Sequence, residues 1–185
     1  MKQPIDLKGE RVALRKPKRS DIVGLQATGV HNEYAYMCGD GAVAEVSYPK
    51  RAYWAKWCRA QGKGHGFAIE FEGRCIGGVR LGHISKADKN ATFTIGIYDP
   101  ALYGQGLGTQ ATRLMLRYGF ETLGLHRVYL KVLDYNARGI RCYEKCGFVR
   151  EGTFRDSAWI DGAWHSDVIM GILEDEYINA REATP

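Results

Sequence analysis

Apolar and polar residues alternate along several short segments of the chain, a pattern typical of strands with one buried face. Together with runs of β-branched and aromatic residues, this alternation predicts strands at residues 11–15, 67–71, 75–81, 92–98, 127–133, 152–160 and 164–173. The turn sequences Glu72-Gly73-Arg74 and Asp161-Gly162 each join two of these strands, so they predict two hairpins.

Apolar residues three or four positions apart predict helices instead. This spacing begins in a glycine-rich loop and continues to about residue 123, with the stripe Leu107, Ala111, Leu114, Met115 and Tyr118. Asn136 suits a helix cap and Gly147 a helix end, which predicts a second helix over residues 137–145.

The region between the first two strands is expected to hold two more helices. Ser20 and Asp21 can cap one, and Pro49 can open the other over residues 50–61. Residues 38–47 are expected to form a loop between them.

The order of these elements predicts an α/β fold. A strand, a helix and a second strand follow one another at residues 92–98, 107–123 and 127–133, and such a crossover makes the two strands parallel. The remaining connections favour antiparallel pairing, so we expect a mixed sheet flanked by helices. No repeat or linker interrupts the 185 residues, which predicts a single domain over residues 1–185.

Composition narrows the setting in which the protein works. The chain is 45% hydrophobic and 25% charged, with a net charge of +5, which suits either an anionic ligand or simply a soluble surface. Its five cysteines are scattered and lack zinc-ligand spacing, so we expect free thiols, no metal and a reducing, cytoplasmic location. No signal peptide or membrane span is predicted, and no basic run indicates nucleic-acid binding.

The loop before the first predicted helix indicates an anion site. Gly104, Gly106 and Gly108 occupy alternate positions between a strand and a helix. Glycines let the loop curl and let its backbone approach a ligand, and the exposed N–H groups of a helix N-terminus attract phosphate. A tight turn without a ligand is the simpler alternative.

Two common nucleotide motifs do not fit this loop. A Walker loop requires a lysine after its last glycine, and none follows Gly108. A dinucleotide-binding fold requires G-x-G-x-x-G, whereas Gly104, Gly106 and Gly108 are evenly spaced. These motifs therefore favour neither nucleotide hydrolysis nor hydride transfer.

The loop resembles the acetyl-CoA loop of the GNAT N-acetyltransferases, Q/R-x-x-G-x-G/A, although Tyr103 stands where that family usually has Gln or Arg. The segment from Asn136 to Phe148 resembles the family's N-x-x-A-x-x-x-Y-E-K-x-G-F motif, with Gly139 in place of alanine. The tail after Glu151 resembles the branch of ribosomal-protein-alanine and spermidine N-acetyltransferases. The resemblance covers about residues 11–177.

This resemblance implies the GNAT-type fold, a mixed and mostly antiparallel sheet whose parallel central strands splay apart, flanked by helices. It implies that acetyl-CoA binds as co-substrate with its pantetheine arm in the gap, along the backbone of Ile95, Gly96 and Ile97. The pyrophosphate would lie on the loop formed by Tyr103, Gly104, Gln105, Gly106, Leu107, Gly108 and Thr109. Asn136 would bind the pantetheine arm, and Arg138 would reach a phosphate or remain solvated.

The resemblance also assigns a general acid, Tyr143, which would protonate the leaving thiolate. A half-buried core tyrosine is the simpler reading. The base is less clear from the sequence. His83, at the end of the preceding strand, is the nearest titratable candidate, and ordered water is the alternative.

The acetyl acceptor stays open. Glu33, expected in a loop, and Tyr36, one of several aromatic residues of that region, are candidates for binding it. Positions that resemble the acidic residues of polyamine acetyltransferases are His83 and Thr92 here, which argues against spermidine. A peptide α-amine has a pKa of only about 8 and needs less help from a base, which favours an N-terminus or an amino sugar.

The sequence therefore predicts an enzyme that transfers acetyl from acetyl-CoA to a primary amine: a protein N-terminus, an amino sugar, a polyamine or another small amine. The alternative is a catalytically silent module that binds or senses acetyl-CoA. The C-terminal hairpin would leave an exposed sheet edge, which makes a homodimer possible.

Overall fold

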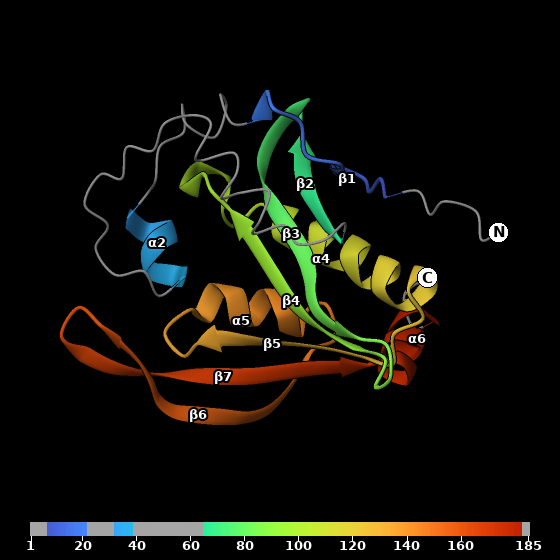
Figure 1. Cartoon of the computed structure of the whole chain (residues 1–185). Coiled ribbons are helices and arrows are strands. Elements are labelled where there is room, and N and C mark those ends of the chain that lie inside the picture. Colours follow the sequence, from blue (N-terminus) through green and yellow to red (C-terminus); the bar gives the residue numbers. More distant parts are fainter. Residues whose placement is uncertain (1–6, 22–31, 39–64, 183–185) are drawn as a thin grey trace.

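A seven-stranded sheet forms the centre of the computed structural model, which describes residues 7–21, 32–38 and 65–182 (Figure 1). The strands run in the order β1-β2-β3-β4-β5-β7-β6. Their bounds are β1 (Val12–Arg15), β2 (Gly66–Phe71), β3 (Arg74–Ser85), β4 (Asn90–Ile97), β5 (Arg127–Leu133), β6 (Val149–Ile160) and β7 (Ala163–Leu173). All neighbouring pairs are antiparallel except β4 and β5, which confirms the predicted mixed sheet.

The helices flank this sheet. They are α2 (Asn32–Cys38), the 3-10 turn η1 (Pro100–Leu102), α4 (Leu107–Arg117), the π-helical turn η2 (Tyr118–Thr122), α5 (Ala137–Glu144) and α6 (Glu174–Glu182). Within the described ranges, none of them has the length and apolar character needed to cross a bilayer.

Some sequence expectations need correction. Glu33 was expected in a loop, but it lies in the first turn of α2, and Cys38 ends that helix. The helix after the glycine loop ends at Arg117 and continues as a π-helical turn. The helices expected after Asp21 and over residues 50–61 lie outside the described residues.

The central parallel strands diverge, as the family resemblance implied. β4 and β5 pair over three positions only, Asn90 with Arg127, Ala91 with Val128 and Thr92 with Tyr129. Beyond Thr92, β4 stays in register with β3 while β5 stays in register with β7 along its whole length. The two strands therefore form a V that opens toward their C-terminal ends (Figure 1).

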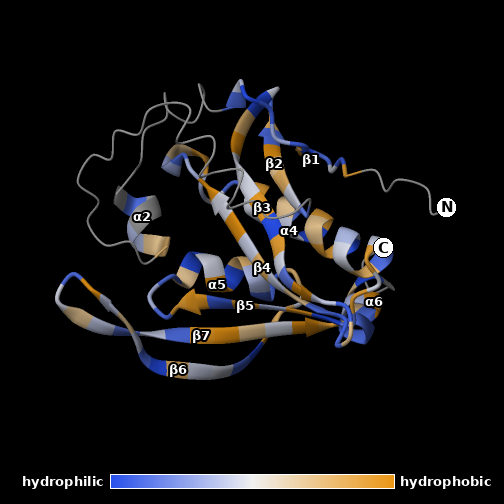
Figure 2. Ribbon diagram, in the orientation of Figure 1, coloured by the Kyte–Doolittle hydropathy of each residue, from blue (hydrophilic) through white to orange (hydrophobic). Residues whose placement is uncertain are grey.

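One apolar cluster holds the sheet to α4 and α5. The predicted helical stripe faces this cluster: Leu107, Ala111 and Met115 are each at most 1% exposed, and Tyr118 is partly buried against it. On the sheet, Phe93 of β4 and Val128 of β5 belong to the same cluster. Figure 2 shows the matching hydrophobic positions along the central strands.

β6 forms one edge of the sheet, opposite β1, and its residues are almost all exposed. The hairpin of β6 and β7 exposes three large side chains, Phe154, Trp159 and Trp164. Dimerisation through this edge stays a prediction.

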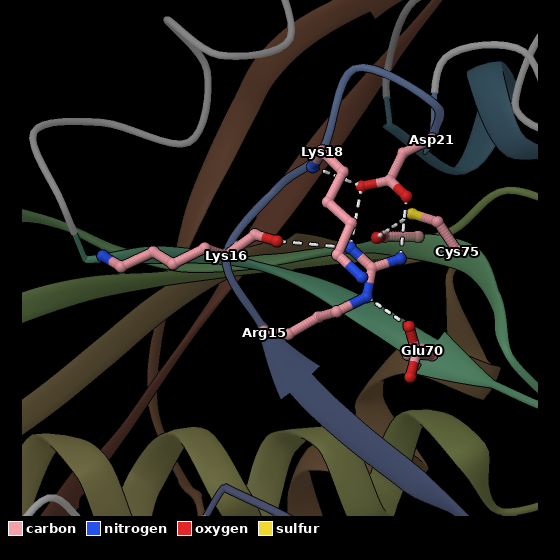
Figure 3. Close-up of polar contacts among 7 residues, drawn as sticks. Arg15, Lys16, Lys18, Asp21, Glu70 and Cys75 are labelled. Atoms are coloured by element: carbon pink, nitrogen blue, oxygen red, sulfur yellow. Dashed lines mark hydrogen bonds and ion pairs between the residues drawn. The ribbon is translucent and has the colours of Figure 1, made fainter.

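An ion cluster fixes the end of β1 (Figure 3). The Arg15 guanidinium donates to both carboxylate oxygens of Asp21, at 2.9 and 2.7 Å, and its Nε donates to Glu70 of β2. The Lys18 amide adds a bond of 2.7 Å to Asp21. Burial works to raise the pKa of Asp21, but the hydrogen bonds and charges of Arg15 and Lys18 lower the pKa overall. The cluster therefore anchors the segment that follows β1.

Candidate active site

The glycine loop presents its backbone to open space. Gly104 and Gly106 have φ angles of +75° and +78°, a left-handed conformation that strongly favours glycine. No heavy atom lies within 4 Å of the position that a Cβ would take at either residue. Gly106 is the N-cap of α4 and offers no side chain to the first turn. The first N–H groups of α4 therefore donate no hydrogen bond to a side chain of the capping residue, and groups of this kind can donate to an anion.

Three side chains of the loop contact the protein rather than solvent on the open side of the loop. Leu107 is 1% exposed and belongs to the core. Gln105 donates through Nε2 to the carbonyl of Ala101, at 3.0 Å. The hydroxyl of Thr109 lies 3.4 Å from the Cys142 thiol on α5. Among these three residues, the backbone is the part that can meet a pyrophosphate.

The V between β4 and β5 leaves backbone polar groups of β4 without a neighbouring strand on the gap side, among the strands that the structure describes. Tyr98 donates its N–H to Ile76 of β3, at 3.0 Å, and backbone polar groups of a strand point alternately to its two sides. The groups of Ile95 and Ile97 therefore point away from β3, toward the gap. The Tyr103 hydroxyl donates to the Ile97 carbonyl at 3.0 Å, so the loop contacts the end of β4 directly.

Arg138, in the first turn of α5, lies beside this loop. Its guanidinium stands 4.0 Å from the ring centroid of Tyr103 and forms an ion pair with Glu33 of α2, at 2.8 Å. Burial raises the pKa of Tyr103 to about 12, so its hydroxyl stays protonated at neutral pH and can donate the hydrogen bond to Ile97. Glu33 therefore lies near the expected cofactor side, in contact with a residue predicted to bind the cofactor.

Asn136 caps α5 as the sequence indicated. Its Oδ1 accepts a hydrogen bond from the Gly139 amide at 2.9 Å, while Nδ2 donates to the Met37 carbonyl at 3.4 Å. A Cβ at Gly139 would lie 2.9 Å from that same Oδ1, so the glycine leaves room for the cap. The side-chain amide of Asn136 therefore forms hydrogen bonds to both α5 and α2 in this structure.

Tyr36 also joins α2 to this region, through a residue that sequence reasoning missed. The Tyr135 ring stacks on Tyr36 at a centroid distance of 4.5 Å, and its hydroxyl donates to the Tyr36 carbonyl at 2.5 Å. Because Tyr135 lies two residues beyond the end of β5, these contacts place α2 at the open end of the V (Figure 1). The aromatic residue beside Asn136 was the available signal.

Tyr143 lies on the helix face of β4. Its half-buried ring packs edge-on against Phe93 and Phe148, with centroid distances of 6.1 and 5.8 Å. The hydroxyl has no hydrogen-bond partner among the residues that the structure describes. Burial raises the pKa of Tyr143, so the phenol stays protonated at neutral pH.

His83 lies on the opposite face. Its Nδ1 is 3.1 Å from the Thr92 hydroxyl, at a bulge where His83 itself has a φ of 46°. Thr92 and Phe93 are neighbours on a strand, so their side chains point to opposite faces. The candidate base and Tyr143 therefore flank the narrow end of the V from two sides.

This geometry agrees with the comparison to known families. A model of the acetyltransferase (GNAT) domain matches residues 11–149. The chain belongs to the GNAT acetyltransferase family. The match includes the glycine loop, the V and Tyr143, so the GNAT resemblance of the sequence is confirmed.

Several GNAT relatives of the chain are named for the substrate that they acetylate. The spermidine N(1)-acetyltransferase of Escherichia coli (strain K12) is 35% identical over 119 residues, which cover 64% of this chain and 63% of that protein. The [ribosomal protein uS5]-alanine N-acetyltransferase of the same strain is 28% identical over 78 residues, 42% of this chain and 40% of that protein. The aligned part is thus less than two thirds of either relative.

Solved GNAT structures share the whole fold. The spermidine N-acetyltransferase from Vibrio cholerae, in complex with CoA and spermine, superposes with a TM-score of 0.76 at 25% identity, covering 92% of this chain and 100% of that one. A putative acetyltransferase from T. thermophilus gives a TM-score of 0.80 at 24% identity, covering 97% and 95%.

Proposed function

We propose that this protein is an acetyl-CoA-dependent N-acetyltransferase that acts on a primary amine. One observation carries the proposal: β4 and β5 separate beyond Thr92, and both the start of α4 and Tyr143 adjoin that point. Thr109 of α4 contacts Cys142, the residue before Tyr143, and the Tyr143 ring packs on Phe93 of β4. The pyrophosphate of CoA would bind the amides from Gly104 to Thr109. The pantetheine arm would then run along the side of β4 that faces the gap, from Ile95 to Ile97, as an added strand would, with the Ile97 carbonyl already bound by the Tyr103 hydroxyl.

The chemistry needs three things, and the residues around the gap can supply them. The amine, in its neutral form, attacks the thioester carbonyl as a nucleophile. The carbonyl oxygen then gains negative charge, which a backbone N–H of β4 can stabilise. The C–S bond then breaks, and the Tyr143 hydroxyl donates its proton to the leaving thiolate. His83 or an ordered water takes the proton that the amine loses.

The acceptor is a primary amine, and similarity to two spermidine acetyltransferases supports a polyamine as the first to test. The positions of His83 and Thr92 offer no carboxylate to a polycation, and Glu33 is already paired with Arg138. A peptide N-terminus, which ionises less strongly, fits these surroundings as well.

Release of free thiol from acetyl-CoA tests the proposal. Purified protein is given spermidine, an alanine-initiated peptide, glucosamine and a buffer blank, and the acetylated product is identified by mass spectrometry. We expect turnover with at least one amine and none with the blank. CoA binding without turnover on any amine would support the alternative, a silent acetyl-CoA-binding module, and no CoA binding would contradict both.

A further inference from the structure

Arg11 makes two long-range contacts with Gln105 of the glycine loop. It directly precedes β1, and its Nη1 donates to the carbonyl oxygen of Gln105 at 3.0 Å across 94 residues of sequence. Its Nη2 lies 3.3 Å from the side-chain oxygen of the same glutamine. A forked guanidinium therefore holds both oxygens of Gln105.

The surroundings keep Arg11 in this position. Its guanidinium stacks over the Phe71 ring at 5.1 Å, and its backbone N–H donates to the Gln110 side chain on α4 at 3.0 Å. The backbone before it is closed by a bond of 2.8 Å from the Gly9 amide to the Val12 carbonyl. Arg11 is thus fixed against β2 on one side and α4 on the other.

The contact has a consequence for the anion site. In a trans peptide the C=O of one residue and the N–H of the next point in opposite directions, and the described chain has no cis peptide. Because Arg11 holds the Gln105 carbonyl on its own side, the Gly106 N–H points to the other side. The left-handed φ of Gly106 then leads directly into α4, whose first free amides follow.

We propose that Arg11 is a positioning residue that orients the Gly106 amide for the pyrophosphate of CoA. The inference rests on the proposed function, because it assigns a residue to the same cofactor site. Arg11 acts through Gln105. Its loss should therefore weaken recognition of the pyrophosphate while leaving events at the acetyl group unchanged.

Two acetyl donors separate this role from general support of the fold. Acetyl-CoA carries the pyrophosphate, whereas S-acetylpantetheine lacks it. For Arg11→Met we expect about tenfold weaker CoA binding by calorimetry, the size of one lost charge-assisted hydrogen bond, and a similar fall in kcat/KM for acetyl-CoA. The kcat/KM for S-acetylpantetheine should stay at the wild-type value.

Two further variants complete the test. Arg11→Lys keeps the charge but not the fork, so its CoA affinity should fall between wild type and Arg11→Met. Arg155→Met, at the opposite edge of the sheet, removes the same charge and should bind CoA as the wild type does. Thermal unfolding checks that each variant is folded, and Arg11→Lys replaces Arg11→Met if the latter is not.

Equal CoA affinity in wild type and the Arg11 variants would overturn the inference and leave the proposed function intact. An equal loss with both acetyl donors would also overturn it, because it would show a structural role alone. A wild-type protein that binds no CoA would overturn the proposed function, and this inference with it.

Discussion

The two glycines at 106 and 108 should respond to alanine in opposite directions. Gly106 has a φ of +78°, where an alanine side chain costs about 1–2 kcal/mol of backbone strain. No heavy atom lies within 4 Å of the position that the alanine Cβ would take, so crowding adds nothing. We therefore expect Gly106→Ala to lower the free energy of unfolding by about 1 kcal/mol, partly offset by the smaller entropy of the unfolded chain.

Gly108 is the matched control, two residues away in the same loop. It lies inside α4, and a Cβ there would be 3.8 Å from the Cys142 sulfur, an ordinary contact. Alanine is favoured over glycine in a helix by about 0.5–1 kcal/mol, so Gly108→Ala should raise the free energy of unfolding.

Urea unfolding of the ligand-free protein measures both effects. In a chain of this size, 1 kcal/mol corresponds to a shift in Tm of about 2–4 °C, so thermal unfolding can confirm the sign. The reasoning would be refuted if Gly106→Ala were as stable as the wild type, or if both variants shifted the free energy in the same direction.

Three further experiments test other parts of the structure. Tyr143→Phe should lower kcat by about 100-fold or more, the usual size of a general-acid contribution, with CoA affinity unchanged by calorimetry; an unchanged kcat would exclude the role. A double-mutant cycle of Glu33→Gln and Arg138→Met should give a coupling of about 0.5 kcal/mol in unfolding that disappears at high salt, because both side chains are partly exposed. Asp21→Asn should cost about 3 kcal/mol at neutral pH, since it breaks a buried ion pair. Because the folded-state pKa of Asp21 is lowered, the stabilisation that its carboxylate provides is complete above the unfolded value of 3.8 and is lost as the pH falls through the folded value. The free energy of unfolding of Asp21→Asn should therefore fall less than that of the wild type over this acid range. Parallel stability curves for the two proteins would contradict this role of Asp21.

The sequence predicted the centre of the fold because local pattern and topology agree there. The apolar pattern set the bounds of β5 at Arg127–Leu133, and a crossover helix of that length requires parallel neighbours. It did not predict α6, which has polar residues around most of its surface. Acidic residues in its first turn, Glu174 to Glu176, were the available signal. Nor did it predict the bulge at His83, because a positive φ in a non-glycine residue depends on the strands around it.

The candidate site was predictable only as far as its local motifs extend. The glycines mark the loop, and Asn136 marks the start of α5. The contacts that assemble these parts join residues about a hundred positions apart, such as Tyr135 with Tyr36 and Arg138 with Glu33. Residue spacing within one sequence carries no information about such neighbours, so the position of α2 came from the structure alone.

A crystal structure with CoA tests the central claim most directly. We predict the pyrophosphate on the amides that begin α4, the pantetheine arm along β4 between Ile95 and Ile97, and the thiol within about 3.5 Å of the Tyr143 hydroxyl. CoA bound away from the V, or a thiol remote from Tyr143, would contradict the account.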